Sequence, residues 1–563
     1  MVGVSWKHSK KIGDLLILAN VLLLVVILNV LGSWYFVRLD LTEEKRYTIK
    51  KQTKDLLEHL DDAVYVEVYL EGDLNPGFER FKKSIRETLE EFRIYSDDRI
   101  QYAFTDPNLA MGEKARNEFI AELNLKGIAP RNVIENKDGK RVEKLVFPGA
   151  VISYGGMETG VMLLKGNAMQ GSQEVLNQAI EGVEYELANA IHKLTNVDRK
   201  KIGFLTGHGE LNGLSIASFE NSLNEQYDIN EVGLSSNEKL ADYDALILAK
   251  PTQAFSNLEK YNLDQYLMRG GRLLLLLDRL DAVMDSASSD NYFAFPYDLN
   301  LDDQLFKYGV RINQDLIQDR VSGRYPIVVS NAGKPQIMQM EWPFFPLINQ
   351  YADHPITRNL DASLFKFTSS MDTIKSVGIK KTPLLFSSPY SRKAVAPVKV
   401  GVNDLRNQLQ SGEFNEAKIP IGYLLEGKFT SVFINRFAPD GADAKIFLEK
   451  STSTKIIVIA DGDIIRNDVN PRDGSVQALG FDPFTQYTFA NQDLLLNSMA
   501  YLLDEDGLIK ARNKEIKIRP LDKEKIREER LFWQVINLLA PLLLVIAFGF
   551  SRSYWRKLKY SKF

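Results

Sequence analysis

Two long apolar segments bracket a chain whose middle part alternates apolar and polar positions. The first covers residues 15–37 and the second covers residues 531–550. A helix needs roughly 20 consecutive apolar residues to cross the hydrocarbon core of a bilayer, and each segment has that length. Between them the apolar residues recur at the spacings of amphipathic helices and half-buried strands. The pattern therefore predicts two transmembrane helices that hold one large folded body at a membrane.

The charges beside the two segments predict the orientation of that body. Basic residues gather on the outer flanks, whereas both signs are mixed on the inner flanks. The outer residues are Lys7, Lys10, Lys11, Arg552, Arg556, Lys557, Lys559 and Lys562. Cytoplasmic flanks carry the excess of positive charge, so both termini are expected in the cytoplasm and the body outside it.

Each apolar segment has an alternative interpretation. The first could be a cleaved signal peptide, but its apolar run exceeds the about 7–15 residues of such peptides. The second could be a buried core helix, which its freedom from charge and its basic tail disfavour. Gln534, Asn537 and Pro541 interrupt this segment. Because uncovered polar groups are costly in lipid, these three are predicted to form a face that packs on a membrane partner.

The pattern next to the first segment predicts a small α/β domain over residues 38–170. Its helical segments show apolar residues on one face, and its strand-like segments are short and rich in branched residues. The expected strands are 64–70, 100–105, 142–147, 150–154 and 161–164, and the expected helices are 78–96 and 113–124. Gly155-Gly156 marks a hairpin between the last two strands.

Residues 171–510 predict a second, larger α/β domain, in which strands and helices alternate as in a doubly wound parallel sheet. The expected strands are 201–205, 244–248, 272–277 and 455–460, and the expected helices are 174–195, 215–226, 257–269 and 491–503. Residues 300–450 read as a β-rich insertion, with hairpin signals at residues 331–334 and at Glu426-Gly427.

The remaining parts of the chain follow from these assignments. They are a cytoplasmic N-terminus at 1–14, a charged stalk at 511–530 and a cytoplasmic basic tail at 551–563.

The net charge of −4 gives no reason to expect a nucleic-acid partner. The chain has no cysteine, which excludes disulfides, cysteine nucleophiles and thiolate metal sites.

The first candidate site is the sequence TGHGE, which lies between a strand and a helix and contains Gly207, His208, Gly209 and Glu210. Such a loop can bind phosphate through backbone amides at a helix N-terminus, and His208 with Glu210 could act as an acid/base pair. Its glycine spacing differs from G-x-G-x-x-G, and the chain has no Walker A sequence. A tight structural turn is the alternative, and no cluster of metal ligands is visible.

The second candidate site is a set of carboxylates at strand ends. Asp278 and Asp281 follow one apolar strand, and Asp461 and Asp463 follow another. The carboxyl ends of parallel strands converge on one crevice, where ligands usually bind. We therefore predict a ligand-binding crevice that these residues share with the glycine loop. The alternative is that they cap the next helix or stabilise a turn.

Several segments together resemble the GldG family, a gliding-motility-associated accessory protein of ABC transporters. They are RLDLTEEKRYTI, YELANAIHKLT, KIGFLTGHGE, the run from YDALILAK to GGRLLLLLD, and KIIVIADGDII. The resemblance implies a permease partner of the GldF kind and a cytoplasmic ATPase of the GldA kind. It also implies a role in surface gliding with an unknown substrate, at the bacterial inner membrane with the body in the periplasm.

The strand–helix–GGRLLLLLD segment also resembles the class I glutamine-amidotransferase fold, whose enzymes use a cysteine that this chain lacks. We therefore expect a non-catalytic subunit without cofactor, metal or catalytic residues, which couples or scaffolds a permease. The alternatives are an anchored hydrolase or metal-dependent enzyme that uses the strand-end carboxylates, and a subunit that delivers a solute to the permease.

Overall fold

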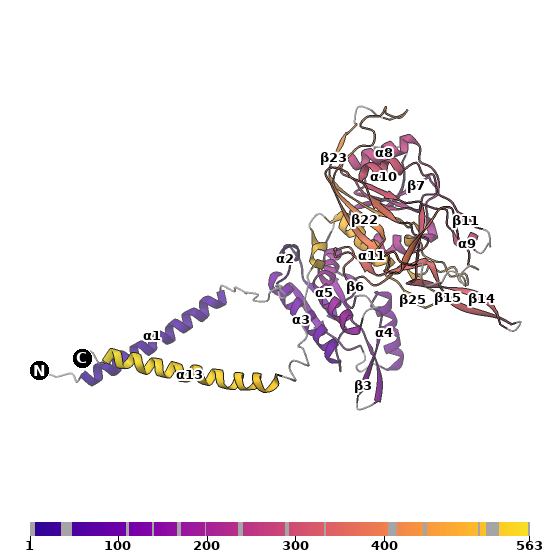
Figure 1. Cartoon of the computed structure of the whole chain (residues 1–563). Coiled ribbons are helices and arrows are strands. Elements are labelled where there is room, and N and C mark those ends of the chain that lie inside the picture. Colours follow the sequence, from indigo (N-terminus) through magenta and orange to yellow (C-terminus); the bar gives the residue numbers. More distant parts are fainter. Residues whose placement is uncertain are drawn as a thin grey trace. The chain divides into compact units, whose positions relative to one another are not determined.

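The computed structural model covers the whole chain and comprises two terminal helices and an α/β body (Figure 1). The residues whose structure it describes are 6–34, 48–107, 112–137, 140–165, 171–196, 199–234, 240–287, 292–331, 334–402, 414–442, 447–504, 507–513 and 529–560.

The two terminal helices are the segments that the apolar pattern predicts. α1 runs Trp6–Trp34 and α13 runs Arg530–Tyr560. Within the described residues, α13 is the one helix long and apolar enough to cross a bilayer, over Arg530–Leu558. The described apolar stretch of α1 is the shorter Leu15–Val30, and residues 35–37 of the first predicted span lie outside the described residues. Two membrane crossings therefore remain a prediction.

The first part of the body is an α/β unit built on a four-stranded sheet. Its order is β2-β1-β5-β6, in which β1 and β2 are parallel and the other neighbours are antiparallel. The elements are α2 Lys51–Glu58, β1 Val64–Val68, α3 Pro76–Tyr95, β2 Ile100–Phe104, α4 Glu113–Leu125, β3 Arg131–Lys137, β4 Lys140–Val146, β5 Gly149–Tyr154, β6 Met157–Met162 and α5 Ser172–Thr195. We call this unit the small domain.

Apolar periodicity and a helix cap explain how the small domain forms. Val64, Val66 and Val68 alternate along β1 and are fully buried under α3 and α5. α3 begins after Asn75, whose Oδ1 accepts hydrogen bonds from the backbone N of residues 77 and 78, and Pro76 occupies the first turn, where no N–H is needed. α3 and α5 contact each other over the sheet.

The second part of the body, the large domain, is built on an eight-stranded sheet. Its order is β16-β19-β22-β23-β10-β9-β7-β8. The strands are β7 Lys201–Thr206, β8 Asp228–Gly233, β9 Ala245–Ala249, β10 Arg272–Leu276, β16 Gln350–Tyr351, β19 Ile379–Phe386, β22 Pro420–Thr430 and β23 Lys450–Ile459. Helices cover both faces: α6 Ala217–Asn224 and α11 Asn491–Leu503 on one, α8 Asn257–Met268 and α10 Asp302–Tyr308 on the other.

Burial on both faces explains the continuous apolar strands. Along β10, Leu274 and Leu276 pack in the core with α6 and α11, whereas Leu273 and Leu275 pack in the core with α8. A strand covered on both sides needs apolar residues at every position. The apolar run at residues 272–277 therefore predicted this central strand correctly.

The sheet differs from the predicted parallel one because it is mixed. β8, β7, β9, β10 and β23 are parallel, but β22, β19 and β16 continue the sheet in antiparallel order. These three strands come from the stretch that the sequence indicated as a β-rich insertion, so this part of the stretch belongs to the main sheet. The likeness to an amidotransferase fold remains a prediction.

Short strands and one long hairpin make up the rest of the large domain. β14 and β15 form the hairpin that residues 331–334 predicted. The remaining elements are η1 Gly213–Ser215, α9 Met284–Ala287, β11 Phe293–Ala294, β12 Val310–Ile312, β13 Asp315–Asp319, β14 Ser322–Asn331, β15 Lys334–Ile348, β17 Ser363–Leu364, β18 Met371–Thr373, β20 Ser391–Val395, β21 Val398–Lys399, η4 Asp463–Ile465, β24 Phe481–Asp482 and β25 Tyr487–Thr488. After α11, η5 Leu508–Asn513 returns to pack on α5.

The predicted hairpin at Glu426-Gly427 is wrong, because β22 continues through both residues. Gly427 has a φ of 139°, and a Cβ there would lie 2.1 Å from the carbonyl oxygen of Gly378. The glycine is present because β19 and β22 approach each other closely, and the chain does not turn there.

We expect the substitution Gly427→Ala to lower the free energy of unfolding by about 1–3 kcal/mol, because it adds strain and a clash with the backbone. Gly474→Ala is the matched control: its φ of 71° is also positive, but a Cβ there has no atom within 4 Å. Thermal unfolding of the full chain compares the two variants. A loss for Gly427→Ala no larger than for the control would contradict the close approach of the strands.

Candidate functional site

The carboxyl ends of four neighbouring parallel strands meet at one edge of the large sheet. β7, β9, β10 and β23 lie side by side there. The residues that follow them are Thr206 to Glu210 after β7, Lys250 after β9, Asp278 soon after β10, and Asp461 to Asp463 after β23. The structure thus places the residues of both predicted sites at the same edge, where open α/β sheets usually bind ligands.

A buried ion-pair cluster joins three of these strand ends. The Nζ atom of Lys250 lies 2.8 Å from Oδ2 of Asp278 and 2.5 Å from Oδ2 of Asp463. Oδ1 of Asp463 also lies 2.9 Å from Nε of Arg466. The side chains of Lys250, Asp278 and Asp463 are 4%, 2% and 8% exposed. The cluster is therefore almost fully withdrawn from water.

The backbone around Lys250 is shaped to bring its side chain to the carboxylates. Lys250 has a left-handed conformation, with a φ of 55°, and its backbone N donates to the carbonyl of Leu276 at 2.9 Å. Gly462 lies against it: a Cβ there would meet the Cβ of Lys250 at 2.6 Å. Gly462 N also donates to Oδ1 of Asp278 at 2.5 Å. Glycine is required here because the two chain segments touch.

Asp461 holds the turn after β23 by accepting three backbone hydrogen bonds. Its Oδ1 accepts from the N–H groups of Asp463 and Ile464 at 2.8 and 3.1 Å, and its Oδ2 accepts from that of Lys366 at 2.7 Å. The side chain is fully buried. Both carboxylate oxygens are therefore engaged with the backbone, as in a helix cap.

Burial dominates the protonation equilibria of the cluster. Burial raises the pKa of Asp278, although Lys250 opposes the effect. Burial and then the charges of Asp278 and Asp463 raise the pKa of Asp461 well above its usual range. Burial lowers the pKa of Lys250, but Asp278 and Asp463 outweigh it and raise that pKa. Lys250 is therefore charged at neutral pH and is unsuited to act as a general base.

The glycine loop after β7 is occupied by its own side chains. Nδ1 of His208 lies 3.2 Å from Oε1 of Glu210, and Nε2 lies 3.2 Å from Oε2 of Glu259. The imidazole ring stacks on Phe255 with its centroid 3.8 Å away. The carboxylates beside the loop would repel a phosphate, so the arrangement disfavours the predicted phosphate cradle.

His208 ties this loop to the start of α8. Glu259 forms the capping box of α8 with Ser256, whose N and Oγ donate to Oε2 of Glu259 at 2.9 and 2.6 Å. Burial would raise the pKa of Glu259, but hydrogen bonds from Ser256 and His208 outweigh it and lower the pKa. The backbone carbonyl of His208 also accepts from the N–H groups of Thr252 and Gln253. The loop is therefore fastened at both its side chain and its backbone.

Sequence reasoning missed Lys250 and Glu259, which complete the two groups. A lysine directly after five apolar strand residues was the available signal for Lys250, because a charge there must be paired or solvated.

Asp281 lies outside the cluster, and its Oδ1 accepts a hydrogen bond from the backbone N of Phe295. Within the described ranges, no group of three or more His, Asp or Glu side chains is arranged to hold a metal ion.

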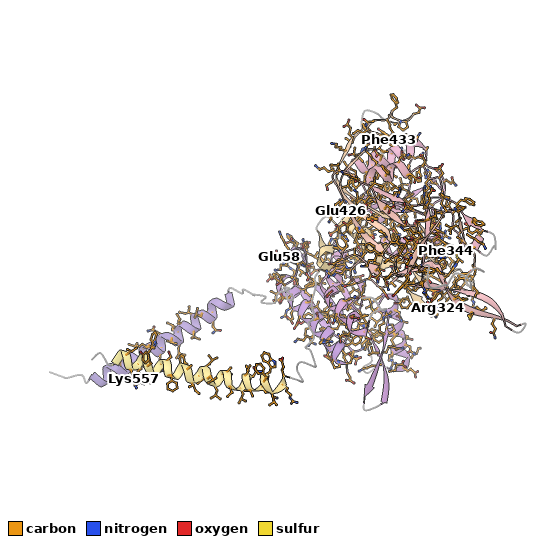
Figure 2. The ribbon with its side chains drawn as sticks, viewed as in Figure 1. Glu58, Arg324, Phe344, Glu426, Phe433 and Lys557 are labelled. Atoms are coloured by element: carbon orange, nitrogen blue, oxygen red, sulfur yellow. The ribbon has the colours of Figure 1, made fainter. Side chains whose placement is uncertain are left out.

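The predicted partner face lies on α13. Gln534, Asn537 and Pro541 are three and four residues apart, so they fall on one side of the helix. Pro541 has no N–H, so the carbonyl of Asn537 loses its helical hydrogen bond. Side chains stand out along α13, with Lys557 toward its C-terminal end (Figure 2). The face thus combines two polar side chains with a free carbonyl in an apolar helix.

We expect the substitution Asp461→Asn to lower the free energy of unfolding by about 1–3 kcal/mol, because the amide NH₂ cannot accept from a backbone N–H. Asp440→Asn, at an exposed position in the same domain, is the control and should leave stability unchanged. Chemical denaturation of the full chain measures both variants. If the two variants are equally stable, Asp461 does not stabilise the domain through these backbone hydrogen bonds.

Comparisons with known proteins match most of the body. Residues 199–498 match a family described as ABC-type uncharacterized transport system, and residues 43–153 match a domain of unknown function, DUF7088. An uncharacterized protein of Borreliella burgdorferi is 24% identical over 434 residues, which are 74% of this chain and 77% of that protein.

Among solved structures, the mmIFT52 N-terminal domain aligns over 55% of this chain and 99% of its own, with a TM-score of 0.33 and 15% identity. That likeness is too low to support an argument. The first family match, by contrast, spans more than half of the chain and includes every residue of the strand-end cluster and the glycine loop. The chain belongs to the ABC-type uncharacterized transport system family of auxiliary proteins.

Proposed function

We propose that this chain is a non-catalytic, membrane-anchored subunit that scaffolds or couples an ABC permease in the bacterial cytoplasmic membrane. α1 and α13 cross the membrane, both termini lie in the cytoplasm, and the two domains lie in the periplasm. The permease and a cytoplasmic ATPase are its partners. Family membership supports the transport role, and the charges flanking the two helices support the orientation.

The single observation that carries the proposal is the surface of α13. Its apolar side chains are open: Leu538, Leu544 and Val545 are 70%, 71% and 71% exposed. An apolar surface of this length is stable only in lipid or against another apolar surface. Gln534, Asn537 and the carbonyl freed by Pro541 would be costly in lipid alone. A neighbouring membrane helix that binds these groups satisfies both requirements, and a permease supplies such helices.

The scaffold role draws support from the strand-end cluster. An enzyme needs a base, acid or nucleophile that reaches a substrate. Here Lys250 is paired with Asp278 and Asp463, Asp461 binds three backbone N–H groups, and His208 lies between Glu210 and Glu259. These groups stabilise the domain. The arrangement disfavours the anchored hydrolase that the same carboxylates suggested, and a bound ligand at this edge would have to displace internal ion pairs.

The association with gliding motility, and the GldF-like and GldA-like identities of the partners, rest on the resemblance of the quoted sequence segments to the GldG family. The amidotransferase-like character of the domain at 171–510, and the division of the chain at residues 38–170 and at a stalk over 511–530, belong to the same proposal. The mixed sheet, covered on both faces, is compatible with such a domain.

Purification of the full chain from mild detergent should recover a multi-span permease and an ATPase. The double substitution Gln534→Leu and Asn537→Leu should lower the recovered permease roughly fivefold to tenfold, since each interhelical hydrogen bond contributes on average about 0.6 kcal/mol. Leu539→Val with Leu543→Val, on the opposite side of α13, is the control and should leave recovery unchanged. If the wild-type chain recovers neither partner, the proposal is wrong; if the double variant recovers both, α13 does not bind through this face.

A further inference from the structure

Two segments of the body contact three consecutive residues of α5: the segment that follows α1 in the chain and the segment that precedes α13. The described chain resumes at residue 48 after α1, and its last described segment before α13 is η5. Glu184, Tyr185 and Glu186 of α5 receive these segments. All three side chains are buried, two of them carboxylates. Two buried carboxylates on one helix are costly unless each has a partner. The contacts of Glu184 and Glu186 therefore identify the segments that α5 binds.

Glu184 holds the N-terminal connection. Its Oε1 accepts from the backbone N of Lys50 at 2.6 Å and from Oγ1 of Thr53 at 3.0 Å. The residue at the N-cap of α2, Lys50, provides no side-chain cap. The carboxylate of Glu184 therefore caps α2 from another helix and also complements the positive end of its dipole. Ile49 next to it is buried in the core of the small domain.

Tyr185 and Glu186 hold the C-terminal connection. Tyr185 packs with Ile509 and Ala511 of η5, and the guanidinium of Arg512 lies 5.0 Å from the Tyr185 ring centroid. Nη2 of Arg512 lies 3.8 Å from Oε1 of Glu186. The Arg512 side chain is 2% exposed, and its Nε and Nη1 have no hydrogen-bond partner among the described atoms. Glu186 is thus the carboxylate that compensates this buried charge.

Glu186 also reaches the large domain. Its Oε2 lies 3.1 Å from Nζ of Lys165, which lies 3.4 Å from Oδ1 of Asp493 in the first turn of α11. Burial would lower the pKa of Lys165, but Asp493 and Glu186 outweigh it and raise the pKa. A chain of alternating charges thus runs from η5 to α11: Arg512, Glu186, Lys165 and Asp493.

The contact between α5 and η5 is not closely packed along its whole length. A cavity of about 410 Å³ borders it, and its lining includes Tyr185, Asp504 and Ile509. Asp504 holds the turn into η5, since its carboxylate accepts from the backbone N of Gly507, Leu508 and Ile509 at 2.7–3.0 Å. The lining also includes Asn189 and Lys193 of α5, so the free volume lies beside the contact between α5 and η5. A segment that borders such a volume can shift without disturbing a packed core.

We propose that Glu184, Tyr185 and Glu186 form a coupling junction that links the membrane helices to the contact between the two domains. Arg512 and Glu186 connect η5, the last described segment before α13, through Lys165 to Asp493 at the start of α11. Glu184 connects the first described residues after α1 to the same helix, α5. A shift of η5 is passed through these ion pairs to the start of α11. The inference uses the proposed function only in treating α1 and α13 as the membrane side.

Hydrogen exchange of the full chain in detergent, without any partner, tests this junction. Asp493→Asn weakens the far end of the charge chain at a half-exposed position, so the protein should still fold. Three ion pairs connect Asp493 to Arg512, whereas the direct contact of α11 with η5 lies near Ala500 and Tyr501, at the other end of α11. Coupling through the charges predicts that amide exchange in η5 rises about fivefold or more while exchange at the C-terminal end of α11 stays unchanged. Glu158→Gln, which weakens the exposed pair with Lys126, is the matched control and should leave η5 unchanged.

The reverse substitution tests reciprocity. Arg512→Met removes the charge in η5 and should raise exchange in the first turn of α11, because coupling between two sites acts equally in both directions. If Asp493→Asn changes exchange only in α11 and near Lys165, the junction does not transmit and the proposal is wrong. Because the protein is measured alone, this outcome is independent of whether a permease co-purifies.

Discussion

The burial of one ammonium group, that of Lys250, is the constraint on which the large domain depends. An ammonium withdrawn from water costs several kcal/mol unless carboxylates compensate it. Asp278 and Asp463 can do so only if β10 and β23 run parallel, side by side, and end at the same level as β9. Gly462 must lack a side chain because it touches Lys250, and Asp461 must hold the turn that presents Asp463. The ion pairs of this cluster therefore depend on both the order and the direction of the central strands.

This constraint bears on whether the strand-end edge of the sheet can bind a ligand. In an open α/β sheet this edge usually binds ligands. Here the polar groups that could contact a ligand bind each other or the backbone, and the glycine loop is filled by His208 and its two glutamates. The strand-end geometry of this sheet thus serves stability. Among the described residues, unsatisfied requirements remain elsewhere: the exposed apolar length of α13 and two buried guanidinium nitrogens of Arg512.

Buried ion pairs also occur at α5, where they have a different consequence. There the charges come from four parts of the chain: η5, α5, the segment after β6 and the first turn of α11. Around Lys250 the carboxylates are fixed by neighbouring strands of one sheet. Around Glu186 they join segments that could move relative to one another. A network of the first kind makes a domain rigid, whereas one of the second kind can transmit a displacement.

The sequence allowed the main helices and central strands to be predicted because their signals are local. Apolar residues at every position identified β10, and apolar residues on one face identified α3, which begins two residues before the predicted start. β8 was missed because half of its residues, DINEVG, are charged or polar, which breaks the apolar run. Gly427 was misread as a turn because a glycine required by close strand approach and a glycine required by a turn give the same local signal.

By itself the sequence determined the apolar ends, the alternation of strands and helices, and the arrival of Asp278 and Asp461 at strand ends. Only the tertiary structure decided that the sheet is mixed and that Lys250 lies between two carboxylates. It also decided that His208 contacts Glu259, and that Glu186 faces both Arg512 and Lys165. The reason is that periodicity depends on neighbours along the chain, whereas pairing of buried charges depends on strand register and on the packing of segments that are distant in sequence.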